Sequence, residues 1–189
     1  GPALTVILEG LPAGLSIDFD ALNHELVRRQ RGYGRGARMK IEKDRVEVQG
    51  GIRNGRTTGG PICLRIQNRD WENWKQEMAI ESGKTGKEFT KPRPGHADLS
   101  GSLKYKFDDL RNVLERSSSR ETAIRVAVGA FVKELLYEFD IEIFSHVVQI
   151  GPVKVDELKI KDKLTENINK IADESEVRCM DSKVGKEMI

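Results

Sequence analysis

Two apolar stripes at helical spacing limit how this chain can bury its side chains. They lie in the stretch DDLRNVLERSSSRETAIRVAVGAFVKELLYEF and are separated by the polar interval ERSSSRET. Leu110, Val113 and Leu114 form the first stripe, and the second runs from Ile124 to Leu135. Apolar residues that recur every three or four positions are typical of amphipathic helices. The pattern therefore predicts a short helix followed by a long one.

Short apolar runs elsewhere in the chain favour strands. Residues 4–8, 45–48, 62–66 and 141–150 are rich in Ile, Leu and Val and adjoin glycine or polar residues. Asp18 precedes a further helical stripe and is positioned to cap it. A chain of 189 residues with 38% apolar content can bury one substantial core. The sequence thus predicts an α/β (α+β) protein with residues 1–189 in a single domain.

The stretch RRQRGYGRGARMK, residues 28–40, concentrates positive charge. It holds six cationic side chains and three glycines and no acid, although the whole chain has 32 basic and 30 acidic residues and a net charge of only +2. Arginine binds phosphate and carboxylate through a planar fork. The stretch therefore predicts a polyanion site, and the local charge favours a small ligand. A solvated basic loop and a nucleic-acid-binding module that uses RGYGRGAR remain alternatives.

Regular periodicity is lost between residues 68 and 102, which predicts a long loop. Trp71 and Trp74 in this segment are predicted to pin the loop to the core. His96 lies between Arg93 and Asp98, and an imidazole titrates near neutral pH. For a lone loop histidine, a structural role is the more common one. The later interval ERSSSRET offers hydroxyl groups at a helix start, which suits either an anion or a helix cap.

The cysteines and the chain ends give no sign of metal or membrane binding. Cys63 and Cys179 match neither a metal-ligand nor a CxxC spacing, so packing roles in a reducing compartment are predicted. No apolar run is long enough to cross a bilayer, and no signal peptide pattern is present. These features predict a cytoplasmic protein without a metal.

Three long motifs together resemble the chorismate synthase family. They are RRQRGYGRGARMKIEKDRVEVQGGIRNGRTTGGPI, TKPRPGHADLSGSLKY and DDLRNVLERSSSRETAIRVAVGA, and the opening GPALTVILEGLPAG looks like the continuation of the family's GESHG signature. The resemblance covers essentially all 189 residues. Gln49 and Gly51 replace a common Ser-Gly, and Ser119 replaces Ala or Gly. The family's GESH and its C-terminal half are absent, so the chain is expected to be an N-terminal part, incomplete at both ends.

The resemblance implies a fold, a reaction and a set of partners. The fold is a β-α-β sandwich of mixed or antiparallel sheets packed with helices, assembled as a homotetramer. The enzyme, a lyase, removes phosphate from 5-enolpyruvylshikimate 3-phosphate by anti-1,4-elimination and forms chorismate in the shikimate pathway of aromatic amino acid biosynthesis. It requires reduced FMN, with NADPH as a reductant of the flavin in some members. No nucleic acid or membrane partner is implied.

The resemblance also assigns roles to individual residues of this chain. Matched motif by motif, it implies His96 as catalytic, Arg29, Arg35 and Arg38 as substrate- and nucleotide-binding, and Arg116, Ser117 and Ser118 as FMN-binding.

Overall fold

A three-stranded antiparallel sheet supports the main core. The computed structural model describes residues 1–35, 43–81, 88–156, 160 and 168–189. Strand β5 (Ile62–Gln67) lies between β1 (Ala3–Leu8) and β2 (Glu47–Gly50), and Val6 is paired with Leu64 at the centre of the β1–β5 ladder. Alternate side chains of β5 are buried on one face, as the period of a strand requires.

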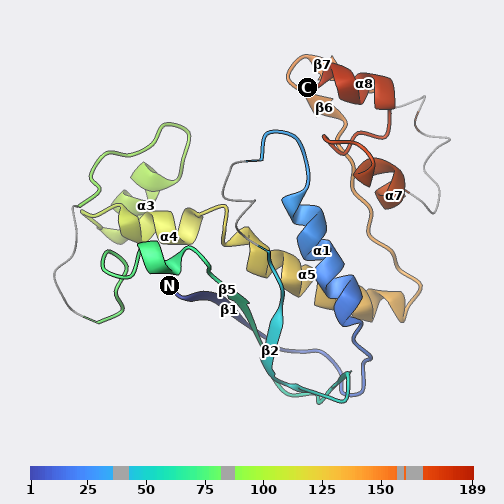
Figure 1. Cartoon of the computed structure of the whole chain (residues 1–189), viewed down its shortest axis with the longest axis horizontal. Helices are drawn as coiled ribbons and strands as arrows, with labels where there is room; N and C mark the ends of the chain where they lie inside the picture. Colours follow the sequence, from blue (N-terminus) through green and yellow to red (C-terminus); the bar gives the residue numbers. More distant parts are fainter. Residues whose placement is uncertain (36–42, 82–87, 157–159, 161–167) are drawn as a thin grey trace.

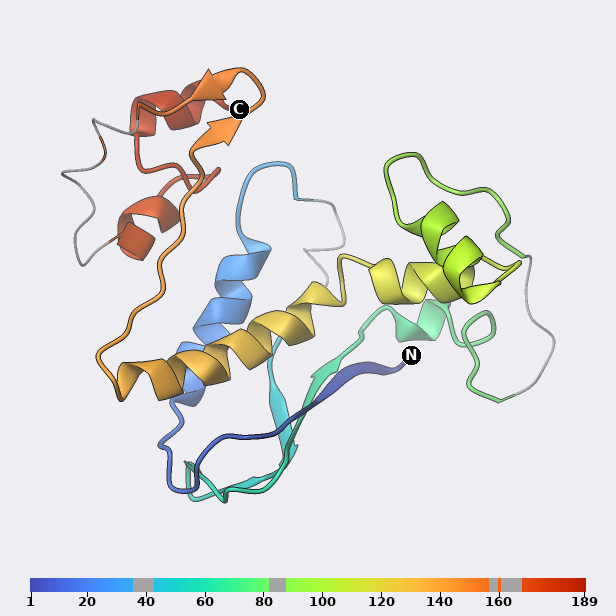
Figure 2. The same cartoon turned by 180° about the vertical axis from the view of Figure 1, so that it is seen from behind.

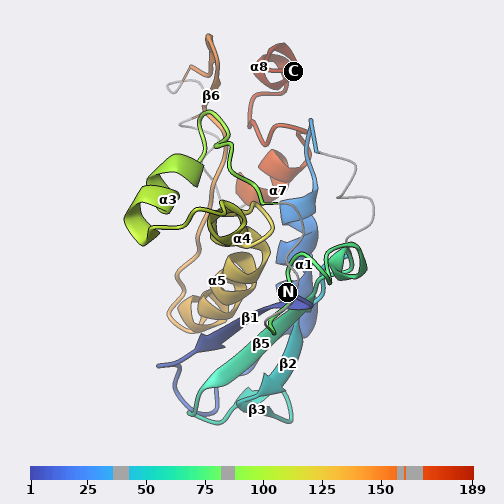
Figure 3. The same ribbon diagram turned by 90° about the vertical axis from the view of Figure 1, so that its left-hand side faces the viewer.

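Helices α1 (Phe19–Gln30) and α5 (Thr122–Tyr137) cover that face of the sheet (Figures 1 and 3). Helix α1 begins at the predicted cap, because an Asp18 carboxylate oxygen accepts hydrogen bonds from the backbone N–H groups of Asp20 and Ala21. Helix α5 buries Phe131 completely. Its other buried residues are mostly alanines, and α1 packs closely against it.

A tight hairpin follows β2. Strands β3 (Ile52–Arg53) and β4 (Arg56–Thr57) form it, and the buried Thr57 hydroxyl donates to the Pro12 carbonyl oxygen at 2.6 Å. Gly51 enters this hairpin with φ +87°, and a Cβ atom there would lie 2.4 Å from the Pro61 carbonyl oxygen. Only glycine suits this position.

Three short helices lie at the end of the sheet near the N-terminus. They are η1 (Trp71–Asn73), α3 (Asp98–Tyr105) and α4 (Arg111–Ser117) (Figure 1). The N-terminal amino group forms an ion pair with Glu115 of α4 at 3.0 Å. Helices α3 and α4 are in close contact, since Gly101 faces the side chain of Val113.

The C-terminal elements form a smaller apolar cluster beyond the end of α1 (Figure 2). They are β6 (Gln149–Ile150), β7 (Val153–Lys154), α7 (Ile168–Asp173) and α8 (Ser182–Glu187). Arg28 of α1 connects the cluster to the main core, because its Nε atom lies 2.5 Å from the Asp173 carboxylate.

The long strand predicted over residues 141–150 is wrong for 141–148. Only Gln149 and Ile150 are in a strand. Backbone groups before them bond elsewhere: the Asn169 side chain contacts Ser145 N–H and the Ile143 carbonyl oxygen, and Val147 N–H donates to the Arg178 carbonyl oxygen. The apolar composition of this run is that of a strand, but its backbone follows an irregular path.

The predicted α+β class is confirmed. The structure combines helices with small antiparallel sheets. Among the described residues, no helix is both long and apolar enough to span a membrane.

Candidate functional site

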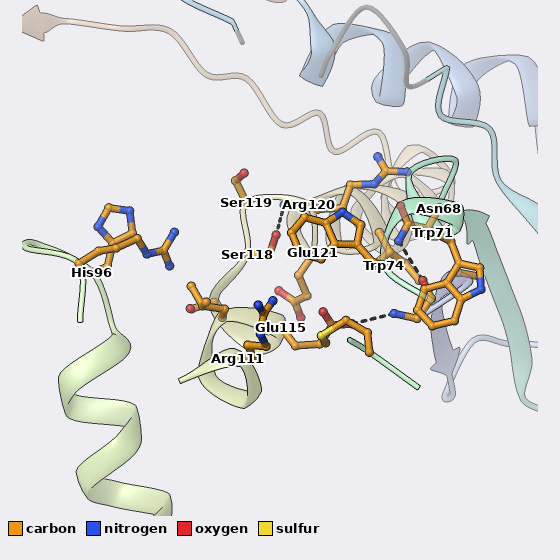
Figure 4. Close-up of a pocket in the computed structure, with 17 residues that line it drawn as sticks. Asn68, Trp71, Trp74, His96, Arg111, Glu115, Ser118, Ser119, Arg120 and Glu121 are labelled. Carbon is orange, nitrogen blue, oxygen red and sulfur yellow. Dashed lines mark hydrogen bonds and ion pairs between the residues drawn. The ribbon is translucent and has the colours of Figure 1, made fainter. Parts of the chain in front are cut away.

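A cavity of about 560 Å³ lies where the chain's N-terminus, η1, the loop before α3 and the turn between α4 and α5 meet (Figure 4). His96 lies at one side of the cavity and Trp71 and Trp74 at the other, with Ser118 and Arg111 between them. The polar, charged and tryptophan residues that line it are Asn68, Trp71, Trp74, Arg93, His96, Arg111, Glu115, Ser117, Ser118, Ser119, Arg120 and Glu121.

His96 is held by the loop PRPGHAD. Its Nδ1 atom lies 2.9 Å from the Pro94 carbonyl oxygen, and its backbone N–H donates to the Arg93 carbonyl oxygen at 3.3 Å. At the end of the loop Asp98 is fully buried and accepts from Arg93. These hydrogen bonds from the Arg93 guanidinium and backbone lower the pKa of the Asp98 carboxyl to about 2.

The three serines form the turn that leads into α5. Ser118 Oγ accepts a hydrogen bond from Arg120 N–H at 3.2 Å, and Ser117 Oγ donates to the Val113 carbonyl oxygen at 2.9 Å. The Ser119 carbonyl oxygen accepts from Thr122 Oγ1 at 2.6 Å. Ser118 thus stabilises the turn and lines the cavity, but it does not cap α5, because the N-cap position of that helix is Glu121 and makes no side-chain cap hydrogen bond.

A buried carboxylate fixes two arginines behind this turn. Asp44 is 4% exposed, and its Oδ1 atom lies 2.5 Å from Nη1 of Arg120. Its Oδ2 atom lies 3.5 Å from Nη1 of Arg29, and Arg29 also donates to the Ser119 carbonyl oxygen at 2.7 Å. The end of α1 is therefore tied to the start of α5 through charge-assisted contacts.

The structure brings together some of the predicted site residues. His96, Ser117 and Ser118 line one cavity, and Arg29 contacts the turn that forms its wall. Arg35 is exposed, and its Nε atom donates to the Arg31 carbonyl oxygen at 2.9 Å.

Arg116 and Arg38 have other positions. Arg116 lines a neighbouring hollow of about 240 Å³ between α3 and α4, which shares Ser117 with the main cavity. Arg38 lies outside the described residues.

Sequence reasoning missed the tryptophan side of the cavity. Trp71 and Trp74 were predicted to pin the loop to the core, which is wrong, because both indoles line the cavity and Trp74 is 41% exposed. Trp74 Nε1 donates to Asp70 at 2.9 Å, and the Arg111 guanidinium lies 5.9 Å from the centre of the Trp74 ring. Two tryptophans in a segment rich in charge, glycine and proline were the available signal.

The arrangement suits a planar, anionic small molecule. Indole faces can stack on an aromatic ring, and arginines with hydroxyl groups can bind phosphate or carboxylate. The volume lies within the range of roughly 300–1,000 Å³ that is usual for small-molecule sites. Fold and site together define an α+β protein with a mixed aromatic and cationic ligand cavity.

Comparison with known proteins identifies the family. The sequence profile described as chorismate synthase matches residues 1–189, and the chain belongs to the chorismate synthase family. It is 54% identical over 192 residues to chorismate synthase of Alkaliphilus metalliredigens, covering 100% of this chain and 49% of that protein. Chorismate synthase of Aquifex aeolicus is 61% identical over 163 residues, covering 85% of this chain and 41% of that protein.

Solved structures agree with this assignment. The structure described as "Crystal Structure of Chorismate Synthase" matches with a TM-score of 0.74 and 42% sequence identity, over 99% of this chain and 47% of that one. The chain thus spans about half the length of the relatives it matches. The family assignment does not favour the nucleic-acid-binding alternative.

Proposed function

We propose that this chain forms part of a chorismate synthase, the lyase that eliminates phosphate from 5-enolpyruvylshikimate 3-phosphate to form chorismate. The observation that carries the proposal is the single cavity in which His96, the Ser117–Ser118 turn and several arginines meet. The substrate carries a phosphate and two carboxylates, so a cavity with fixed cations matches its charge. Family membership supports the same reaction.

In this proposal, arginines of the chain stabilise the negative charge of the departing phosphate. The Arg93 and Arg111 guanidinium groups lie on the cavity wall, where fixed cations can stabilise charge that develops on a departing phosphate. His96 can hold or accept a proton at Nε2, because its Nδ1 atom is engaged with the Pro94 carbonyl oxygen. Trp71 and Trp74 contribute apolar surface that limits access of water.

The proposal includes reduced FMN as cofactor and NADPH as a reductant of the flavin. The cavity residues fit a flavin in kind, since the indoles suit a planar ring and arginine and serine suit a phosphate. When bound, reduced FMN supplies a transient source of electrons to a reaction without net redox change. In this proposal Arg116, Ser117 and Ser118 hold FMN, and Arg29, Arg35 and Arg38 bind substrate and nucleotide.

The proposal extends to the whole protein. Its relatives are about twice as long, which supports residues 1–189 as one part of a single domain. We infer a homotetramer as the assembled form. Apolar side chains exposed at Phe139, Ile141 and Ile143 support a surface that is covered in that assembly.

The direct test is chorismate formation by the protein at the full length of its relatives. With substrate and reduced FMN under anaerobic conditions, we expect chorismate and phosphate in equal amounts. His96→Ala should lower kcat by about 10² to 10⁴, the usual effect of losing an acid or base, with FMN still bound. His24→Ala, on the exposed side of α1, is the matched control and should leave kcat unchanged. Wild-type turnover in the His96 variant would remove His96 from the reaction.

A further inference from the structure

Asp98 is a fully buried carboxylate beside the cavity with no role in the reaction proposed above. Each hydrogen bond that the structure gives its side chain comes from Arg93: the backbone N–H at 2.9 Å, Nε at 2.9 Å and Nη2 at 3.0 Å. A buried carboxylate needs such compensation, because its charge has lost water. The Arg93 guanidinium therefore binds the Asp98 carboxylate through two nitrogens, and the Arg93 backbone N–H adds a third bond. We call this set of three bonds the clamp.

The clamp closes a short loop that contains His96. Arg93 and Asp98 are its two ends, and the Arg93 carbonyl oxygen also accepts from His96 N–H at 3.3 Å. Within the loop, His96 Nδ1 lies 2.9 Å from the Pro94 carbonyl oxygen. A carbonyl oxygen can only accept, so this contact is a hydrogen bond only when Nδ1 carries the proton. The loop geometry thus leaves Nε2 as the nitrogen that can exchange a proton with a ligand.

The same clamp fixes the charge next to His96. Two of the three side-chain nitrogens of Arg93 are directed at Asp98, and Nη1 has no partner among the described residues. Arg93 lines the cavity and its side chain is 40% exposed, so Nη1 is the donor left for an anion.

The position of the clamp relative to the serine turn is set by helix packing. Asp98 is the first residue of α3, and Gly101 one turn later lies directly against Val113 of α4. Helix α4 ends at Ser117, which lines the cavity. Asp98 is therefore linked through rigid elements to the serine turn beside His96.

We propose that Asp98 is a positioning residue, which holds the 93–98 loop in place through its bonds to Arg93. In this loop His96 keeps its proton on Nδ1 and presents Nε2 for proton transfer. Arg93 Nη1 lies on the same loop as a hydrogen-bond donor for an anion. The identity of the reaction rests on the proposed function, but the geometry of the loop does not.

Asp98→Asn is the first variant, because it keeps the volume and removes the charge. The ¹⁵N resonances of the imidazoles in the 189-residue chain, without ligand and at a pH where the ring is neutral, report which nitrogen is protonated. We expect Nδ1–H at His96 in the wild type and a mixture of both tautomers in Asp98→Asn. Asp109→Asn is the matched control, since Asp109 fastens the same segment by accepting from Phe89 N–H and Arg111 N–H and does not touch Arg93. It should leave the His96 signal unchanged.

Kinetics in the full-length protein then separate positioning from folding. Displacement of a reacting group by about 1 Å costs on the order of 10²-fold. We expect Asp98→Asn to lower kcat by about that factor at a temperature where thermal unfolding shows the variant to be fully folded, although its unfolding midpoint is lower than that of the wild type. If Asp98 acts through Arg93, Arg93→Lys should give a similar loss and the double variant little more than the larger single one, since the two effects are not additive.

Each outcome decides the proposal. Unchanged His96 resonances in Asp98→Asn, or additive kinetic losses in the double variant, would overturn it. If Asp98→Asn does not fold, Arg93→Lys carries the test, because lysine keeps the charge but lacks the fork, and the same change in tautomer is expected. If the wild type forms no chorismate, the proposed function fails, while the imidazole resonances still decide whether Asp98 positions His96.

Discussion

At the scale of single residues, buried carboxylates hold the arginines of this site in place. Asp44 contacts Arg120 and Arg29, and Asp98 contacts Arg93. Both carboxylates are almost or fully inaccessible to water. Arginines held in this way have a defined direction before any ligand arrives, which reduces the cost of ordering them on binding.

The first prediction concerns Asp44→Asn. Removing one charge leaves the buried guanidinium of Arg120 without its carboxylate, so the free energy of unfolding should fall by about 3–5 kcal/mol. Urea denaturation measures this loss. Glu47→Gln is the matched control, because the Glu47–Arg65 pair is 42% and 37% exposed, and it should cost at most about 1 kcal/mol. Equal losses in the two variants would mean that the Asp44 contacts add nothing beyond a surface pair.

The second prediction concerns the pH dependence of Asp98. Hydrogen bonds from Arg93 lower its pKa to about 2, whereas an aspartate in an unfolded chain has a pKa of about 3.9. The folded state therefore gains stability from this group above about pH 4, and loses it as the pH falls toward about 2. The difference in unfolding free energy between wild type and Asp98→Asn should be constant near neutral pH and shrink across that window. A difference that does not vary with pH would contradict the assignment.

At the scale of secondary structure, the contact between α3 and α4 sets the distance between His96 and the serine turn. Gly101 permits this contact, since a Cβ atom at that position would lie 2.4 Å from Val113 Cγ1. Glycine has a low helix propensity, so its presence inside α3 reflects packing.

The third prediction is a pair of glycine substitutions. Gly101→Ala should destabilise the protein by about 1–3 kcal/mol, because the added methyl group overpacks the α3–α4 contact. Gly129→Ala in α5 is the control: a Cβ atom there meets nothing within 4 Å, and alanine should stabilise the helix by about 0.5–1 kcal/mol. Thermal unfolding of both variants measures the difference. Stabilisation by Gly101→Ala would show that α3 can move away from α4 without cost.

At the scale of the whole molecule, apolar side chains remain exposed beyond the end of α5. Phe139, Ile141 and Ile143 are 66%, 46% and 51% exposed. Exposed apolar side chains that are grouped in one segment are candidates for an interface. The backbone N–H groups of Phe139 and Ile141 donate to the Leu136 carbonyl oxygen at the end of α5, and the Ile143 carbonyl oxygen accepts from the Asn169 side chain.

The fourth prediction follows from that surface. The 189-residue chain should associate as its concentration rises, and the double variant Ile141→Ser and Ile143→Ser should shift this association to higher concentration. Sedimentation velocity measures the change. Ile80→Ser is the control, because Ile80 is 88% exposed and lies outside the surface, and it should have no effect. A wild-type chain that stays monomeric at all concentrations would contradict the prediction.

The sequence by itself determined the elements whose signal is local. Helices α1 and α5 and strands β1 and β5 were predictable, because the periodicity of their side chains is written in consecutive residues. The family could also be recognised, because three long motifs keep their order and register. The proposed catalytic role of His96 also rests on those motifs, since a lone loop histidine carries no such signal.

Tertiary structure alone decided which residues meet. Asp44 reaches Arg120 across 76 positions of sequence, and Trp71 and Trp74 face a cavity that is closed by residues of α4 and the turn before α5. The backbone path of the apolar run at 141–148 likewise could not be predicted from the sequence, because it depends on contacts with Asn169 and Arg178. Local periodicity reports how a segment buries its own side chains. The partners of a buried charge depend on chain folding that brings distant segments together, and no short pattern in the sequence encodes that.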